Sequence, residues 1–284
     1  MMTTNERPPL LSVDVLGGKV AYHDVGEGGV TILLHGGGPG ASGFSNFSRN
    51  IGPLSAGRRV ITIDLPGYGG SDNRDIEGSM FDVLSAVLVG FMDALDIQKA
   101  SLVGNSLGGG TSLRTALDHP DRVEKLVLMG AGGSLPIHSV FPTPGLMKMF
   151  TYYLGDGPSE KKLQAIINEL VYDPKLILPE LFQQRLEASM RPDVIANPPL
   201  RQRKGASALR DDLWREPLHK VKHPVLLIWG REDKVIPLDS AFLYQKTLPN
   251  AELHVFPRCG HWAQWEKADQ FNALVAQFLD RPAS

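Results

Sequence analysis

Short apolar runs recur along the chain from residue 30 onward, and longer segments with helical patterning separate most of them. The runs are VTILL, RVITID, ASLVGN, KLVLMG, HPVLLIWG and ELHVFP. Continuous apolar strands that alternate with helices are typical of a mainly parallel sheet that is covered on both faces. Before them, LSVDVLGGKVAYHDVG has two alternating segments about Gly17 and Gly18, which predicts an antiparallel hairpin at the start of the sheet.

The alternation breaks between about residue 136 and residue 212, where helical stretches are punctuated by proline and glycine. We see no convincing strand there and expect a helical insertion between two strands of one sheet. The 284 residues would then form a core domain from residues 1–135 and 213–284, with the helical insertion at 136–212.

Charge and cysteine content exclude several classes of partner and location. Lys and Arg number 29 against 31 Asp and Glu, so no overall field would attract nucleic acid or an anionic membrane. The single Cys259 cannot form an intrachain disulfide, and the start of the chain lacks the apolar core of a signal peptide. No apolar run approaches the ~20 residues that span a bilayer. We therefore expect a soluble, cytoplasmic protein with no nucleic-acid or membrane partner.

The segment ASLVGNSLGGGTSLRTAL holds a G-x-S-x-G motif formed by Gly104, Ser106 and Gly108. The motif follows a predicted strand and opens a predicted helix. Ser106 would then sit on a sharp turn with its hydroxyl presented at the sheet edge, and small residues two positions to either side let the turn close. A helix-capping serine in a chance glycine turn is the alternative, but the further glycines after the motif favour a nucleophile.

A serine nucleophile needs a base, and the base needs an acid that orients it. In chains with this serine turn they follow in the order serine, acid, histidine. LLIWGREDKVIP places Glu232 and Asp233 after one strand, and HVFPRCGHWAQW places His261 after the next. All of these groups follow the carboxyl ends of strands, where open α/β sheets build their sites. The residues alone leave the choice between Glu232 and Asp233 open.

Other candidate groups have plainer interpretations. His219 and His223 stand four residues apart but run into a proline with no third ligand nearby, so we predict no metal site. Asp64 and Asp72 flank LPGYGGS, where we expect them to stabilise a turn. Cys259 is interpreted as a small filler.

The stretch HGGGPGASGFSN, residues 35–46, offers backbone N–H groups to a negative charge. Its letters include a G-x-G-x-x-G match, the spacing of a dinucleotide-binding turn. Pro39 inside that match lacks an N–H and a hairpin precedes the strand, so a cofactor phosphate is disfavoured. An HGGG sequence after such a strand suits one side of an oxyanion hole, whose other N–H comes from the residue after the serine, Leu107.

Three motifs make the chain similar to the α/β-hydrolases, and more narrowly to the meta-cleavage product hydrolases, which break a carbon–carbon bond in ring-opened aromatic compounds. They are LHGGGPGASGFSNFSRNIGPL, LVGNSLGGGTSLRTALDHPDRVEKLVLMGAGG and LHVFPRCGHWAQWEKADQFN. The similarity runs over nearly the whole chain, and GGGPGASG-x-SN together with CGHWAQWE is more specific than the serine motif. The resemblance implies an α/β-hydrolase fold, with a mostly parallel eight-stranded sheet, helices on both faces and an inserted helical lid.

The resemblance implies a role for each matching residue. Ser106 would be the nucleophile, His261 the base and Asp233 its orienting acid, while Gly37 and Leu107 would donate to the oxyanion. The residues implied to bind substrate are Gly36, Gly38, Asn46, Asn105, Arg185 and Trp262. It implies no cofactor and no metal, and it implies a homodimer or larger homo-oligomer.

Such enzymes convert 2-hydroxy-6-oxohexa-2,4-dienoates to their keto form and then cleave C5–C6, which gives 2-hydroxypenta-2,4-dienoate and a carboxylic acid. An aryl group at C6, such as phenyl, is favoured because the insertion is rich in aromatic and methionine residues. Those that could line its pocket are Phe141, Met147, Met149, Phe150 and Tyr153. A carboxylesterase on the same fold and a non-enzymatic ligand receptor are the alternatives, since the triad does not distinguish C–C from C–O cleavage.

Overall fold

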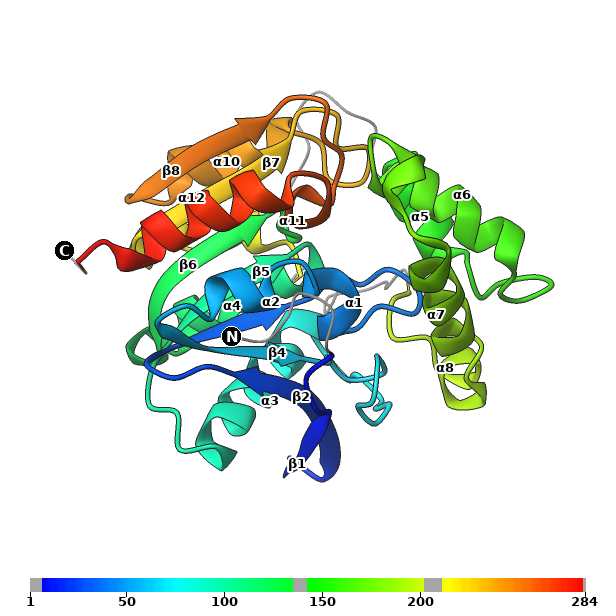
Figure 1. Cartoon of the computed structure of the whole chain (residues 1–284), viewed down its shortest axis with the longest axis horizontal. Coiled ribbons are helices and arrows are strands. Elements are labelled where there is room, and N and C mark those ends of the chain that lie inside the picture. Colours follow the sequence, from blue (N-terminus) through cyan, green and yellow to red (C-terminus); the bar gives the residue numbers. More distant parts are fainter. Residues whose placement is uncertain (1–6, 135–141, 202–210, 283–284) are drawn as a thin grey trace.

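An eight-stranded sheet runs through the molecule (Figure 1). In the computed structural model, which describes residues 7–134, 142–201 and 211–282, its strand order is β1-β2-β4-β3-β5-β6-β7-β8. The strands are β1 (Leu11–Val15), β2 (Gly18–Val25), β3 (Gly29–Leu34), β4 (Arg58–Ile63), β5 (Ala100–Asn105), β6 (Val123–Met129), β7 (Val225–Gly230) and β8 (Ala251–Phe256). β2 pairs antiparallel with β1 and β4, and all other pairs are parallel. The predicted sheet with its initial hairpin is confirmed.

The hairpin turns one residue earlier than its glycine pair predicts. Val15 pairs with Gly18, so Leu16 and Gly17 form a two-residue turn and Gly18 begins β2. Both turn residues have positive φ, 49° and 78°, which suits a tight hairpin with right-handed strand twist. Leu16 adopts this unfavourable conformation where its side chain is exposed.

Helices cover both faces of the sheet. They are α1 (Gly43–Phe47), α2 (Ile51–Leu54), α3 (Met80–Ala94), α4 (Leu107–Asp118), α10 (Asp239–Thr247), α11 (Ala263–Glu266) and α12 (Ala268–Asp280), with short 3-10 turns at Pro120–Arg122, Leu213–Arg215 and Leu218–Lys220. In β3, Ile32 and Leu34 pack in the core shared with α3, α4 and α10, whereas Leu33 packs in the core shared with α1, α2 and α12. Because both faces are apolar, the strands appear in the sequence as continuous apolar runs. In the part of the chain that the structure describes, no helix is both long and apolar enough to cross a membrane.

The segment between β6 and β7 is helical, as the break in the alternation predicts. It holds α5 (Pro144–Phe150), α6 (Glu160–Leu170), α7 (Pro179–Ser189) and α8 (Pro192–Ala196), with a 3-10 turn at Pro174–Leu176. These helices lie to one side of the sheet in Figure 1, next to the loops that follow β3, β4 and β8. Its described residues contain no strand. The expected start of the insertion at residue 136 lies outside the described residues.

Candidate active site

Ser106 stands in the sharp turn between β5 and α4. Its backbone angles, φ 51° and ψ −109°, are unusual for a residue with a side chain. A Cβ atom added at Gly104 would lie 2.3 Å from the carbonyl oxygen of Gly108, and one added at Gly108 would lie 2.2 Å from that of Leu34. The two glycines of the motif are therefore required by backbone contacts, and the serine between them is only partly buried.

His261 and Asp233 form a buried pair. The Nδ1 atom of His261 lies 2.7 Å from Oδ2 of Asp233, whose Oδ1 accepts the N–H groups of Val235 and Ile236 at 2.8 and 3.0 Å. The carboxylate thus orients the ring with Nδ1 protonated, which leaves Nε2 to accept a proton. Nε2 is buried and has no hydrogen-bond partner among the described residues. Asn105, the neighbour of the serine, donates to the carbonyl oxygen of His261 at 3.3 Å.

Of the two adjacent acids, Asp233 is the one that contacts the histidine. Glu232 instead accepts the N–H of Cys259 at 3.1 Å and pairs with Arg231 at 2.7 Å. Its carboxylate therefore supports the backbone of the loop that leads to His261.

His35, the first residue of HGGG, is wholly buried and holds the peptide group between Gly36 and Gly37. The N–H of Leu65 donates to its Nε2 at 2.9 Å, so Nδ1 carries the proton and donates to the carbonyl oxygen of Gly36 at 2.8 Å. Burial lowers the pKa of His35 to about 4, against a partial offset from Asp64, so the ring is neutral near pH 7. Because the peptide group is planar, fixing the Gly36 carbonyl also fixes the N–H of Gly37.

Acidification is expected to destabilise the fold through His35. Its pKa lies near 4 in the folded chain and near the ordinary 6.5 in the unfolded chain. The stability that the neutral ring contributes is complete above about pH 6.5 and is lost as the pH falls toward 4. A shift of this size corresponds to about 3 kcal/mol. Between pH 7 and pH 4.5, urea unfolding should show a smaller loss in the free energy of unfolding for His35→Asn than for the unchanged protein. Equal losses would show that His35 is not the source of the acid destabilisation.

Arg185, on α7, is a buried cation at the other end of the site. It is 1% exposed, and burial lowers the pKa of its guanidinium to about 9, which leaves it charged near pH 7. Nη2 donates to Oδ1 of Asn46 at 2.7 Å, Nη1 donates to the carbonyl oxygen of Pro39 at 3.3 Å, and the group stacks 4.3 Å from the ring of Trp262. Among the described residues no carboxylate pairs with it, and its Nε has no partner.

The remaining predicted substrate residues lie between Arg185 and the serine turn. Asn46 donates to Oδ1 of Asn105 at 3.4 Å. A Cβ added at Gly36 would meet that same oxygen at 2.7 Å, and one at Gly38 would lie 3.4 Å from Nη1 of Arg185. The structure thus brings together the residues that the sequence motifs singled out, in one continuous line from the cation to the serine.

Three side chains that hold this site in place were not found from the sequence. His35 is the first, Tyr68 donates to the carbonyl oxygen of Gly37 at 2.9 Å, and Glu266 accepts the N–H groups of Gly260 and Tyr172, both at 2.8 Å. In the sequence, the motifs HGGG, LPGYGGS and CGHWAQWE, in which these three residues stand, were the signals that could have identified them. Asp64 likewise joins two loops, because it accepts N–H groups from residue 43 and residue 70 at 2.7 and 2.9 Å.

The described residues contain no cluster of three histidine, cysteine or acidic side chains that could hold a metal ion. His223 contacts the carbonyl oxygen of Pro120 at 2.9 Å, and His254 packs against Phe256 with ring centroids 4.3 Å apart. Cys259 is buried, and burial raises the pKa of its thiol well above the usual range. That thiol is therefore a poor nucleophile.

The side chains expected to line the lid pocket differ in burial. Met149 is buried, Phe150 and Tyr153 are partly buried, and Met147 is 39% exposed, so Met147 does not face the core. Phe141 lies outside the described residues. Which of these side chains line a substrate pocket stays a prediction.

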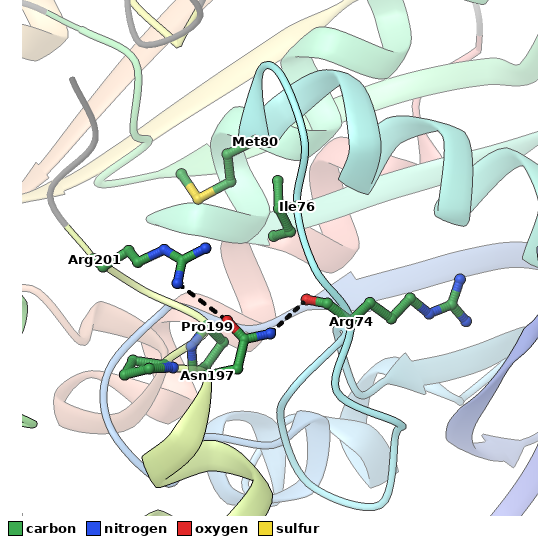
Figure 2. A pocket seen from close by; sticks show the side chains of 7 residues that line it. Arg74, Ile76, Met80, Asn197, Pro199 and Arg201 are labelled. Carbon is green, nitrogen blue, oxygen red and sulfur yellow. Dashed lines mark hydrogen bonds between the residues drawn. The ribbon is translucent and has the colours of Figure 1, made fainter. Parts of the chain in front are cut away.

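The end of the insertion closes over the HGGG loop. A Cβ added at Gly37 would lie 3.3 Å from the side chain of Leu200 and 3.2 Å from that of Leu107. Beside Leu200 lies a small recess (Figure 2), which is lined by Arg74, Ile76, Met80, Asn197, Pro198, Pro199 and Arg201. There Asn197 donates to the carbonyl oxygen of Arg74 at 3.2 Å and accepts from Nη1 of Arg201 at 3.1 Å.

Comparison with known proteins gives the fold and the family of the chain. The α/β-hydrolase fold family model matches residues 30–268. A 2-hydroxy-6-oxononadienedioate/2-hydroxy-6-oxononatrienedioate hydrolase of Burkholderia vietnamiensis is 43% identical over 93% of this chain and 91% of its own. A 2-hydroxy-6-oxo-6-phenylhexa-2,4-dienoate hydrolase of Burkholderia cepacia is 42% identical over 92% of this chain and 91% of its own.

A solved structure leads to the same family. The meta-cleavage product hydrolase of Pseudomonas fluorescens superposes with a TM-score of 0.83 at 36% identity, over 95% of this chain and 97% of that one. The chain therefore belongs to the α/β-hydrolase family and, within it, to the meta-cleavage product hydrolases, serine enzymes that cleave a carbon–carbon bond.

Proposed function

We propose that this enzyme hydrolyses 2-hydroxy-6-oxohexa-2,4-dienoates that carry an aryl group at C6, with residues 136–212 as a lid over the site. The products would be 2-hydroxypenta-2,4-dienoate and an aromatic carboxylic acid. Cytoplasmic location and a homodimer or larger homo-oligomer are part of the same proposal. The observation that carries it is the buried guanidinium of Arg185 at one end of a site that has a serine turn at the other.

Arg185 differs from the other buried arginines among the described residues. Arg58 pairs with Asp280, and Arg114 pairs with three carboxylates, of which that of Asp118 is 2.7 Å away. A buried guanidinium without a carboxylate partner carries a desolvation cost that an anionic ligand would offset. The planar fork suits a carboxylate with an adjacent oxygen, which is the chemistry of the C1–C2 end of the dienoate.

The first step is ketonisation. His261 removes the proton from the C2 hydroxyl, the double bonds shift, and C5 gains a proton. The C2 oxygen becomes a ketone that is conjugated with C3 and C4. This change matters because the electron pair that later leaves C6 can then be delocalised as far as the C2 oxygen.

Cleavage follows at C6. The Ser106 hydroxyl, or a water molecule activated beside it, adds to the C6 carbonyl while His261 takes its proton, and the N–H groups of Gly37 and Leu107 receive the oxyanion. The C5–C6 bond then breaks, its electrons pass to the dienolate, and the C2 oxygen is reprotonated by His261. If an acyl-enzyme forms, water releases it, so one water molecule is consumed on either route.

An aryl group at C6 is supported by apolar side chains that belong to one core cluster with Leu107, the residue after the serine. Leu146 and Met149 of α5 are buried against the core, and Leu200 covers Gly37. A second carboxylate on the substrate would need a cation there. The two arginines at the recess in Figure 2 are directed to other groups: Arg201 donates to Asn197, and Arg74 donates to the carbonyl oxygen of residue 18 at 2.8 Å.

Turnover of three substrates tests the proposal. Loss of the yellow chromophore is followed with the 6-phenyl dienoate and with 2-hydroxy-6-oxononadienedioate, and a neutral aryl ester is assayed in parallel. We expect kcat/KM for the phenyl substrate to exceed that for the dienedioate by about tenfold or more. Rapid ester turnover with both dienoates untouched would instead indicate a carboxylesterase, and binding without any turnover would indicate a receptor.

The variant Arg201→Gln serves as the control for the C6 preference. If the recess does not bind a second carboxylate, the ratio of the two dienoate rates stays the same in this variant. A selective loss of dienedioate turnover would show that Arg201 binds that group and would overturn the aryl preference.

A further inference from the structure

Tyr68 connects the loop after β4 to the HGGG loop, residues 35–38, which is called the oxyanion loop below. The reaction steps above do not use Tyr68. Its side chain is 4% exposed and its hydroxyl donates to the carbonyl oxygen of Gly37 at 2.9 Å. Its ring packs edge-on against His35, with centroids 5.0 Å apart. Burial raises the pKa of the Tyr68 phenol, so the group stays protonated and remains a donor.

Two consecutive peptide groups around Gly37 are therefore held by side chains. His35 holds the carbonyl before Gly37, and Tyr68 holds the carbonyl of Gly37 itself. Glycine has more backbone freedom than any other residue, so a glycine that must aim its N–H needs constraint from outside. With both flanking peptides fixed, the φ and ψ of Gly37 are fixed as well.

The loop that carries Tyr68 is itself held by the end of the insertion. Asn73 donates to the carbonyl oxygens of Asp193 and Asn197, both at 2.8 Å, and Arg191 donates to the carbonyl oxygen of Gly69. A Cβ added at residue 67 would meet the side chain of residue 199 at 2.7 Å. Tyr68 thus lies between the docked insertion and the oxyanion loop.

From these contacts we infer that Tyr68 is a positioning residue of the oxyanion hole: its hydroxyl holds Gly37 so that the N–H points at the developing oxyanion. The inference rests on the proposed function in assigning the oxyanion to Gly37 and Leu107. This hydrogen bond would stabilise the transition state more than the bound substrate, because the negative oxygen appears only during cleavage.

The variant Tyr68→Phe removes the hydroxyl and keeps the ring. We expect the rate of C–C cleavage to fall about tenfold, while KM stays the same. The double variant with Ser106→Ala should bind the dienoate with the same affinity as Ser106→Ala alone. In single-turnover experiments, product formation should slow more than ketonisation. Hydrolysis of an aryl ester passes through the same oxyanion and should slow by a similar factor, so the inference can be tested even if the dienoate is not the substrate.

Tyr152→Phe is the matched control. That tyrosine is equally buried and its hydroxyl lies 2.8 Å from Oγ of Ser189 within the insertion, away from the oxyanion loop. Its loss should change cleavage by less than about twofold. The inference fails if Tyr68→Phe behaves like this control on both substrates, or if its main effect is a higher KM, which would make Tyr68 a substrate contact. A clearly lower midpoint of thermal unfolding in the slower variant would also overturn the inference, because the lower rate would then reflect a general loss of stability.

Discussion

Replacing Ser106 with alanine should stop C–C cleavage and leave the dienoate bound. The hydroxyl is the group that attacks C6 or activates the attacking water, and the partners His261 and Asp233 are of little use without it. Loss of a triad serine typically lowers kcat by ~10⁴-fold or more. Alanine can occupy the turn as serine does, because the glycines two positions to either side, and not the hydroxyl, let the backbone close.

Single-turnover absorbance measurements test this expectation. With Ser106→Ala, addition of enzyme should shift the spectrum of the dienoate on binding, and the products should fail to appear. Ser112→Ala is the matched control, since Ser112 lies buried in the helix that follows Ser106 and donates to the carbonyl oxygen of Gly108 at 2.8 Å. That variant should retain activity. If Ser106→Ala kept full activity, the serine would have no place in the mechanism.

The positions of the strands and of the serine turn follow from the sequence because simple local physics determines them. Parallel strands buried on both faces must be apolar throughout, so runs such as VTILL mark them. The serine turn is equally direct, because the contacts at Gly104 and Gly108 leave no space for a Cβ. The hairpin turn differs by one residue from its prediction, since strand pairing sets the register and places Leu16 at positive φ.

The choice between neighbouring acids could not be made locally. Glu232 and Asp233 differ by one position in a turn after β7, and backbone geometry decides which of them reaches the histidine. Asp233 is fixed by two N–H groups of its own turn, whereas Glu232 reaches across to residue 259. The contact of Asp233 with His261 and that of Glu232 with Cys259 both depend on how β7 and β8 lie together, which composition does not encode.

The burial of Arg185, by contrast, had a signal in the sequence. On an amphipathic helix an arginine normally faces solvent, yet Leu181, Arg185 and Ser189 are spaced four apart and form the buried face of α7. The helix also approaches the glycine-rich stretch closely, since a Cβ at Gly40 would lie 1.9 Å from the carbonyl oxygen of Arg185. A charged residue in line with small and apolar ones was thus the sequence signal for a buried cation.

Arg185→Gln is expected to lower kcat/KM for the dienoate by about 100-fold, because a buried, charge-assisted pair with the substrate carboxylate is lost. A neutral aryl ester has no such carboxylate and should lose less than about threefold. Stability should not fall in parallel. In the unliganded protein the guanidinium is buried without a carboxylate partner, so removing its charge relieves a desolvation cost.

Steady-state kinetics on both substrates, together with thermal unfolding, separate these contributions. Arg185→Lys is the informative companion, since it keeps the charge but loses both the planar fork and the stacking on Trp262, and it should fall between Gln and the unchanged protein. Equal losses on the dienoate and the ester, accompanied by a lower melting temperature, would make Arg185 a structural residue of α7. A selective loss on the dienoate at unchanged or higher stability is what a binding cation requires, because the cost of burying it is then offset only when substrate is present.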